Sequence, residues 1–496
     1  MKKYLIGMDI GTSGTKSVLF DTDGNIVASA LAEYPMYQPE NGYAEQDPED
    51  WWEAACKTLR QFCPKADEGK IVGIGLSGQM HSLVLLDKDN KVIRPAILWC
   101  DQRTAAECTE IEETVGKERL VEITANPALP GFTASKIMWV KKHERENFAR
   151  CAHILLAKDY IRFKLTGEYA TEVSDASGMQ LLDVKKRCWS KEICEKLGVD
   201  MKLLATVYES PEIAGAVTKE SALLTGLDEG IVVAGGAGDN AAAAIGTGVY
   251  KEGRAFTTIG TSGVVFAPTN EPIIDKAGRV HTFCAAVPNT WHVMGVTQAA
   301  GLSLNWFRNT AAADISYREI DNECENLPIG AEKLIYLPYL MGERTPILDS
   351  NARGVFFGLS AMHTRFHMAR AVIEGVSYSL YSCLEILREM NITVDDMALC
   401  GGGGKSVFWQ QMLCDIYGIP IKTMQSNEGA ALGAAILGGC AAGVYGSVSE
   451  GCDRVIKAKE PALPDKERTL EYRKIYEIYS SLYPALKESF KRLSEI

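Results

Sequence analysis

The chain has 496 residues, of which 46% are hydrophobic and 23% charged, and its formal net charge at pH 7 is −12. This length and composition predict a globular protein with two large or three smaller domains and ample core. The acidic balance argues against a nucleic-acid backbone or an anionic membrane as the main partner, since both require clustered Lys and Arg.

The cysteines and the N-terminus indicate a cytoplasmic protein. The 14 cysteines form no C-x-x-C and no spacing typical of a zinc site, which favours reduced, buried thiols in a reducing cytosol. The short apolar run that follows Lys3 ends at Asp9, which is too soon for a signal peptide. No stretch reaches the roughly 18 apolar residues of a membrane-spanning helix.

The first half of the chain begins with a predicted β-hairpin. An apolar strand, the turn Gly11–Gly14 (GTSG) and a second strand follow one another over residues 4–21. A third strand is predicted over 25–35, a helix over 47–62 with Asp47 as its N-cap and Pro48 at its first position, and a buried strand over 70–76.

The second half repeats this order. The same four residues, GTSG, recur at Gly260–Gly263 inside a hairpin pattern over residues 254–268, about half the chain length later. A strand (290–296), a long helix (366–390), a strand running into glycines (395–404) and a helix (406–418) follow. A shared turn between matching strands favours internal duplication over chance, with the two halves meeting near residues 235–250.

Gly-Thr-Ser turns present several backbone N–H groups and hydroxyls to one point, which suits a phosphate. Asp9 precedes the first turn, and a carboxylate beside a phosphate requires a cation between them, typically Mg²⁺ bound through water. Lys16 could offset phosphate charge. A third glycine cluster, Cys400–Ser406 (CGGGGKS), links a strand to a helix and lets a ligand approach the backbone closely. The alternative for Asp9 is a turn-capping aspartate.

These motifs carry a family resemblance. "DIGTSGTK", "IGTSG" and "GGGGKS" resemble the phosphate and adenosine motifs of the actin, sugar-kinase and seventy-kilodalton chaperone superfamily, and residues 132–140 and 354–375 resemble the two signature stretches of the FGGY carbohydrate kinases. The resemblance implies an α/β fold of two ribonuclease-H-like domains around a central cleft. Residues 1–240 would form the sugar side with the first phosphate loop, and residues 241–496 the nucleotide side.

The resemblance also implies a reaction, the ATP- and Mg²⁺-dependent phosphorylation of a pentulose. D-xylulose, giving D-xylulose 5-phosphate, is the expected sugar. Asp239, which lies among alanines and glycines in "GDNAAAAIG", would accept the proton of the sugar hydroxyl, and Asp9 would hold Mg²⁺ through water. The expected sugar contacts are Met80, His81, Trp99, Asp101, Asp239 and Asn240, and the expected nucleotide contacts are Thr12, Ser13, Lys16, Gly260, Thr261, Gly402, Gly403 and Ser406.

Several alternatives stay open at this point. Asp239 could cap the Ala-rich helix that follows it, and His81 could be an ordinary loop histidine. Cys100 stands where the resembled kinases commonly have asparagine, so ribulose, gluconate, glycerol or a deoxy-sugar are further candidate substrates. An actin-like or chaperone-like ATPase and a non-catalytic sugar sensor are the other classes. The amphipathic stretch at residues 467–493 predicts a packed terminal helix, and a homodimer surface is its second interpretation.

Overall fold

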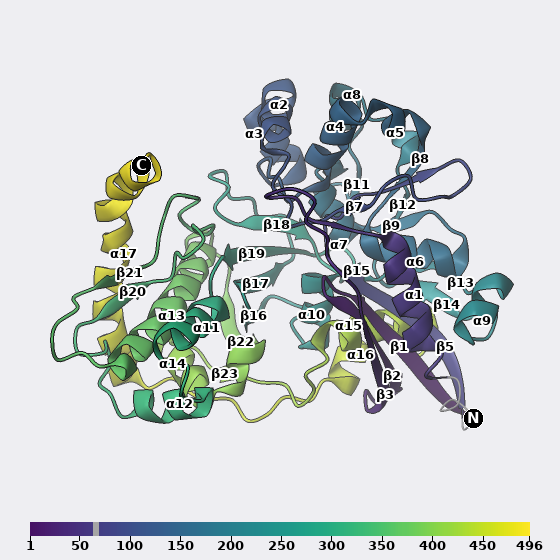
Figure 1. Cartoon of the computed structure of the whole chain (residues 1–496). Coiled ribbons are helices and arrows are strands. Elements are labelled where there is room, and N and C mark those ends of the chain that lie inside the picture. Colours follow the sequence, from purple (N-terminus) through teal and green to yellow (C-terminus); the bar gives the residue numbers. More distant parts are fainter. Residues whose placement is uncertain (63–68) are drawn as a thin grey trace.

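The computed structural model describes residues 1–62 and 69–496, and they form two lobes (Figure 1). A mixed sheet with the strand order β13-β14-β5-β1-β2-β3 forms the centre of the first lobe, with β15 paired to β5. Its strands are β1 (Lys2–Ile10), β2 (Gly14–Asp21), β3 (Ile26–Glu33), β5 (Gly69–Gly78), β13 (Ile213–Ala216), β14 (Val232–Ala234) and β15 (Ala237–Gly238). The core under this sheet is built from alternating strand residues such as Ile6, Met8 and Leu19.

The second lobe has its own sheet, in the order β18-β19-β17-β16-β22-β23. Its strands are β16 (Gly253–Ile259), β17 (Gly263–Thr269), β18 (His281–Cys284), β19 (Trp291–Thr297), β22 (Val394–Cys400) and β23 (Ile421–Lys422). The long helix α13 (Arg365–Glu389) is buried along most of its length against this sheet and against α14 (Val407–Tyr417).

The two sheets repeat one pattern, as the sequence predicted. β1 pairs antiparallel with β2 and parallel with β5, and β16 pairs antiparallel with β17 and parallel with β22. The helix that immediately precedes the parallel strand is α1 (Pro48–Leu59) in the first lobe and α13 in the second. The Asp47 side chain accepts a hydrogen bond from the Glu49 N–H, which confirms the predicted N-cap of α1.

Mostly helical segments extend the first lobe, at the top of Figure 1. They have a hydrophobic cluster of their own, to which Ile111, Ile137 and Ile193 belong. Besides α1, the helices of the first lobe are α2 (Ala105–Val115), α3 (Lys117–Thr124), α4 (Thr133–His143), α5 (Arg145–Arg150), α6 (Ala157–Thr166), α7 (Val173–Ala176), α8 (Lys191–Leu197) and α9 (Lys219–Thr225). Of these, α6 and α9 pack against α1 beside the first sheet and not in the extension. The short strands are β4 (Glu45–Gln46), β6 (Val84–Asp87), β7 (Ala96–Ile97), β8 (Cys151–Leu155), β9 (Ala170–Glu172), β10 (Leu182–Asp183), β11 (Cys188–Trp189) and β12 (Thr206–Tyr208).

Two helices cross with their backbones in contact where the lobes join. These are α10 (Asp239–Gly246) and α15 (Gly429–Ala441). A Cβ on Gly246 would lie 1.8 Å from the Gly429 carbonyl oxygen, and a Cβ on Gly433 would lie 1.9 Å from the Ala242 carbonyl oxygen, so this crossing requires glycine at both positions. α15 also packs on β1 and β5. The division at residues 240 and 241 stays a prediction.

The second lobe ends in α17 (Lys466–Ser494), the helix predicted at the C-terminus. It buries Tyr472, Tyr479, Leu482 and Phe490 against the second-lobe core, in agreement with a packed terminal helix. The lobe also contains α11 (Gly301–Ala311), α12 (Tyr317–Glu325), β20 (Ile335–Leu337) and β21 (Val355–Phe357). The remaining helix, α16 (Val448–Val455), packs with α15 and α10 against first-lobe residues such as Phe20. Within residues 1–62 and 69–496, every cysteine is unpaired and no helix is long and apolar enough to cross a membrane.

Candidate active site

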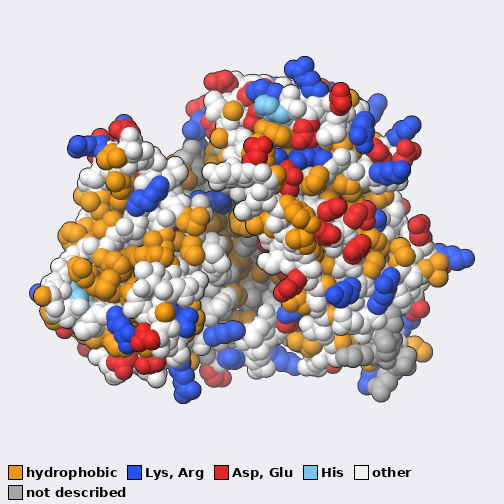
Figure 2. Space-filling model, in the orientation of Figure 1, with side chains coloured by type: hydrophobic (Ala, Val, Ile, Leu, Met, Phe, Trp, Pro, Cys, Tyr) orange, Lys and Arg blue, Asp and Glu red, His pale blue; other side chains and the backbone are white. Residues whose placement is uncertain are grey.

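The surface is hollowed between the two lobes (Figure 2). Each Gly-Thr-Ser turn closes its hairpin through a backbone bond: the Gly11 N–H donates to the Gly14 carbonyl oxygen at 3.0 Å, and the Gly260 N–H donates to the Ser262 carbonyl oxygen at 3.0 Å. The side chains of Ser13 and Thr261, at the tips of these turns, are exposed. Both turns therefore offer hydroxyls and backbone N–H groups to a ligand.

Asp239 is the first residue of α10, and Gly238 is the N-cap. The interpretation of Asp239 as a helix cap is therefore wrong. Its Oδ1 accepts hydrogen bonds from the Asn240 backbone N–H at 2.7 Å and from Asn240 Nδ2 at 3.0 Å. Burial, and then the negative charge of Asp9, raise the pKa of Asp239 to about 7. A carboxyl group with such a pKa can take up a proton at neutral pH.

Asp9 lies at the end of β1, where its Oδ1 accepts a hydrogen bond from Ser77 Oγ at 2.8 Å. Burial raises its pKa, and the nearby positive charge of Lys16 opposes this shift. Two half-buried carboxylates that act on each other electrostatically favour a cation between or beside them. Asp9 and Asp239, about half the chain apart in sequence, thus fit a divalent cation that also contacts phosphate.

Met80 and His81 follow β5 and lie beside the turn that leads to Asp239. A Cβ on Gly238 would approach Met80 Sδ to 2.8 Å, so the Met80 side chain packs directly on the backbone of Gly238. His81 has a left-handed backbone with φ of 68°. Its ring Nδ1 lies 3.1 Å from the Gly178 carbonyl oxygen. Because a carbonyl oxygen only accepts, Nδ1 carries the hydrogen and Nε2 is left as an acceptor for a ligand hydroxyl.

Lys136 fixes the backbone of His81. It is fully buried in α4, and its Nζ donates to the His81 carbonyl oxygen at 2.9 Å and to the Gly131 carbonyl oxygen at 2.7 Å. Burial lowers the pKa of Lys136 to about 7. Burial and the Lys136 charge hold the pKa of His81 well below its usual value, so this ring is neutral. Lys136 was not among the predicted site residues, although it lies within the signature at 132–140.

Trp99 and Asp101 have different surroundings. The Trp99 side chain is 38% exposed, and its Nε1 donates to Thr12 Oγ1 at 3.0 Å. This bond connects a predicted sugar contact to the first Gly-Thr-Ser turn. Asp101 has no exposed surface. Its two oxygens accept from the Ala44 N–H at 2.6 Å and from three N–H groups of Arg103. All four lone-pair positions are occupied, so the geometry does not support the predicted contact of Asp101 with the sugar.

Two further residues singled out in the sequence, Lys16 and Cys100, contact other protein side chains in the structure. Lys16 Nζ donates to Glu428 Oε1 at 2.6 Å, next to the start of α15, so its charge is shared with a carboxylate in this structure. Cys100 is half-buried and packs against the first-lobe core. The departure from asparagine at position 100 therefore replaces a polar amide by a small apolar side chain at the core boundary.

The second lobe contains a cavity of about 940 Å³ between the second Gly-Thr-Ser turn, α11, α12 and α14. This volume suits a nucleotide. A Cβ on Gly401 or Gly403 would lie 2.6 or 2.5 Å from Ile259 atoms, so the glycine cluster is required where it packs on the end of β16. Ser406 Oγ caps α14 by accepting the Trp409 N–H at 3.0 Å. Predicted nucleotide residues that line this cavity are Gly260, Thr261, Gly402, Gly403 and Ser406.

Sequence reasoning missed the opposite wall of this cavity. Asn305 of α11 and Arg318, Asp321 and Glu325 of α12 line it, together with the apolar side chain of Leu302. Burial raises the pKa of Asp321. Residues 301–325 carry no glycine motif, and their amphipathic pattern is that of any surface helix, so nothing in the sequence marked them.

The arrangement of two repeated hairpins, an acid pair and a nucleotide-sized cavity can be compared with known proteins. The model of the FGGY family of carbohydrate kinases, N-terminal domain, matches residues 4–246, and that of the C-terminal domain matches residues 255–442. The chain belongs to the FGGY family of carbohydrate kinases. It is thus a carbohydrate kinase with two domains of mixed α/β structure, as the sequence motifs predicted.

Relatives of this FGGY kinase cover its whole length. A xylulose kinase of Bacillus subtilis (strain 168) is 39% identical over 98% of this chain and 98% of its own. Two crystal structures from Lactobacillus acidophilus superpose with a TM-score of 0.94 each: a ligand-bound xylulose kinase, 31% identical, and a gluconate kinase, 30% identical. Each alignment covers 99% of this chain and 100% of the other. The fold class is therefore that of the sugar kinases.

Proposed function

We propose that this FGGY kinase transfers the γ-phosphoryl group of ATP to D-xylulose, giving D-xylulose 5-phosphate and ADP. The observation that carries the proposal is the position of Asp239, which opens α10 next to Met80 and within electrostatic reach of Asp9; its raised pKa supports the same role. The xylulose kinases among its full-length relatives support the choice of sugar.

In the proposed reaction, the Asp239 carboxylate accepts the proton of the terminal sugar hydroxyl while that oxygen forms its bond to the γ-phosphorus. The bond between this phosphorus and the bridging oxygen breaks, and the electron pair leaves with ADP. His81 Nε2 accepts a hydrogen bond from a second sugar hydroxyl, Asn240 contacts a neighbouring one, and the exposed face of Trp99 packs against the carbon chain. These contacts hold the acceptor oxygen in line with the phosphorus.

ATP would occupy the second-lobe cavity, with its phosphates at the two Gly-Thr-Ser turns. Thr12, Ser13 and Thr261 supply hydroxyl and backbone donors there. Asp9 would hold Mg²⁺ through water, and the cation would neutralise charge on the phosphate oxygens when bound. Removal of divalent cations by a chelator should therefore abolish transfer, and Mg²⁺ should restore it.

The test is a panel of acceptors in a coupled assay of ADP release, with D-xylulose, D-ribulose, gluconate and glycerol. We expect the highest kcat/KM with D-xylulose and little ADP release without any sugar. Asp239→Asn keeps the size of the side chain and removes the base, so kcat should fall about a thousandfold or more while ATP still binds. Equal ADP release with and without sugars, or an active Asp239→Asn variant, would contradict the proposal.

Gluconate is the second candidate substrate, and one residue favours it. The guanidinium of Arg344 makes no hydrogen bond or ion pair with any residue in the described part of the chain, and its charge lowers the pKa of His81. A free guanidinium beside a sugar contact suits a carboxylate. If kcat/KM for gluconate exceeds that for D-xylulose, and Arg344→Gln removes only the gluconate activity, gluconate is the substrate.

A further inference from the structure

Five ionisable side chains form a buried cluster in the first lobe. The cluster consists of Lys158, Asp159 and Arg162 of α6, with Glu172 and Asp175 around α7, and none of them exposes any surface. Lys158 Nζ lies 3.0 Å from Asp159, 3.2 Å from Glu172 and 2.9 Å from Asp175. Burying charges costs free energy that their attraction offsets only in part, so stability alone is a weak reason for such a cluster.

The segment that leads to Asp239 lies next to this cluster and has no polar side chains of its own. A Cβ on Gly235 would lie 2.6 Å from the Glu209 carbonyl oxygen, and a Cβ on Gly236, where φ is 73°, would lie 2.2 Å from the Leu76 carbonyl oxygen. The Met80 side chain packs directly on Gly238. Apart from the methyl groups of Ala234 and Ala237, the segment 234–238 has no side chains. Backbone pairing of β14 and β15 with β5, together with polar groups from other elements, therefore sets its position.

The cluster supplies those groups. Arg162 Nε donates to the Ala234 carbonyl oxygen at 3.3 Å, and Nη2 donates to the Gly235 carbonyl oxygen. Ser174 Oγ accepts the Gly238 N–H at 3.1 Å and donates its own hydrogen to Glu172 Oε1 at 2.9 Å. Gly238 immediately precedes Asp239 and pairs with Gly78 of β5, so the Ser174 hydroxyl is the side-chain contact on the residue next to the carboxylate.

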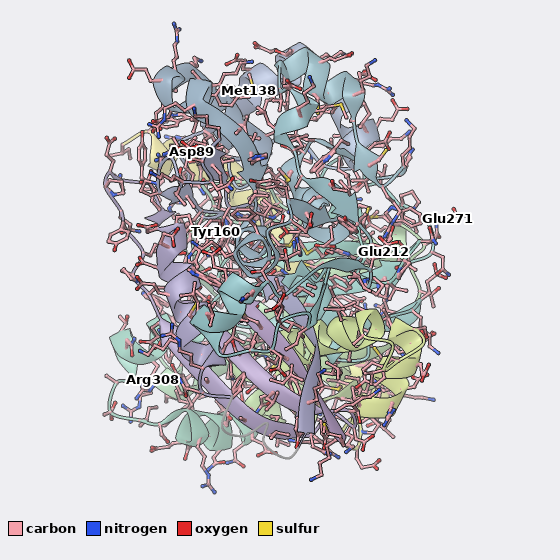
Figure 3. The ribbon with its side chains drawn as sticks, turned by 90° about the vertical axis from the view of Figure 1, so that its right-hand side faces the viewer. Asp89, Met138, Tyr160, Glu212, Glu271 and Arg308 are labelled. Atoms are coloured by element: carbon pink, nitrogen blue, oxygen red, sulfur yellow. The ribbon has the colours of Figure 1, made fainter. Side chains whose placement is uncertain are left out.

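Ser210 contributes further contacts to both Glu172 and the segment before Asp239. Ser210 Oγ donates to Glu172 Oε2 at 2.8 Å, and the Gly236 N–H donates to the Ser210 carbonyl oxygen at 3.0 Å. Figure 3 labels Tyr160 of α6 and Glu212, which accepts the Gly235 N–H; both lie at mid-height, between the helical extension above and the strands of the first sheet below. The cluster is fully buried in the first lobe, and its contacts with the segment before Asp239 are to backbone atoms of that segment.

We propose that Ser174, held in place by Glu172 of the buried cluster, is a positioning residue that orients Asp239 for phosphoryl transfer. The hydroxyl fixes the peptide between Ala237 and Gly238, and that peptide sets the direction in which Asp239 leaves the strand. Ser174 does not touch the reacting atoms. The proposal rests on the proposed role of Asp239 as the base.

Ser174→Ala tests it, with Ser210→Ala as a matched control. Both serines are fully buried and both donate to Glu172, but only the Ser174 hydroxyl also accepts the Gly238 N–H. Because small misplacements in an active site are costly, we expect Ser174→Ala to lower kcat about 10- to 100-fold, with KM for sugar and for ATP changed less than about threefold. Ser210→Ala should change kcat less than about threefold, with a similar shift of the unfolding midpoint.

Ser174→Cys provides a second variant, in which a thiol occupies the position of the hydroxyl. The variant should fold, but its sulfur is a weak acceptor for the Gly238 N–H, so kcat should still fall. Equal kcat for the Ser174 variants and Ser210→Ala would overturn the proposal, because a purely structural role affects both serines alike. Asp239→Asn separates the two ideas. If it stays active, the base assignment fails; if it is inactive while the Ser174 variants match the control, only the positioning role fails.

Discussion

Asp239→Asn should make the ligand-free protein more stable at alkaline pH, in addition to abolishing transfer. Burial and the Asp9 charge raise the pKa of Asp239 from 3.8 to about 7 in the folded protein. The neutral form is thus favoured in the folded state, and the contribution to stability is fully present below the unfolded pKa and lost as pH rises through about 7. Asparagine cannot ionise and therefore removes this penalty.

The pKa shift sets an upper limit on the effect. A shift of about 3 pKa units corresponds to about 4 kcal/mol of unfolding free energy at pH values above both pKa values. Asp239 is half-buried at the cleft rather than sealed in the core, so water and salt screen its charge. We therefore expect about 1–2 kcal/mol in practice, or a rise of about 2–8 °C in the unfolding midpoint of a domain of this size.

Thermal unfolding without ligands, at about pH 5 and about pH 8.5, measures the effect. The midpoint of Asp239→Asn should exceed that of the native chain at the higher pH, and the gap should narrow at the lower pH. Asp101→Asn is the control with the opposite sign, because it weakens a fully buried bidentate pair with Arg103 and should lower the midpoint at both pH values. A variant no more stable than the native chain at about pH 8.5, or a gap independent of pH, would refute the reasoning.

Three further predictions follow from the same geometry. kcat/KM should fall about tenfold per pH unit below about 7, because Asp239 takes up a proton there. In Asp9→Asn, at whatever absolute rate remains, this fall should begin at a lower pH, because the variant lacks a negative charge that raises the Asp239 pKa. Trp99→Phe loses the bond to Thr12 and should raise KM for the sugar about three- to tenfold, as initial rates would reveal. Gly246→Ala places a Cβ 1.8 Å from a carbonyl oxygen and should cost about 2 kcal/mol or more in urea unfolding; an unchanged midpoint would contradict the tight crossing.

Much of the fold could be predicted because its signals are local. The turns Gly11–Gly14 and Gly260–Gly263, each between apolar strands, indicated both hairpins, and Asp47 with Pro48 marked the start of α1. The position of α15 could not be predicted this way. Its small residues suit any close helix packing, and only the tertiary structure shows that they let α15 lie on β1, β5 and α10.

The site divides in the same manner. The glycine-rich motifs were enough to predict the location of their own residues, such as Gly402 and Thr261 at the second-lobe cavity. The partners of charged side chains could not be predicted in this way, because they come from distant parts of the chain. Asp101 was predicted to face a sugar, and its bonds to Ala44 and Arg103 occupy it instead. Lys16 likewise meets Glu428, more than 400 residues away in sequence.

The packing of α10 on α15 explains why two acids so far apart in sequence can act together. Asp239 opens α10, α10 crosses α15 with backbone contact, and α15 packs on β1, which ends at Ile10 next to Asp9. Both carboxylates therefore belong to one tightly packed frame. The turn Gly260–Gly263 joins β16 to β17, and the glycine cluster directly follows β22, so both are attached to the second sheet. We therefore expect any movement of the second lobe to carry the nucleotide toward a fixed acid pair, so that closure changes the distance to the phosphorus without changing the spacing of the two acids.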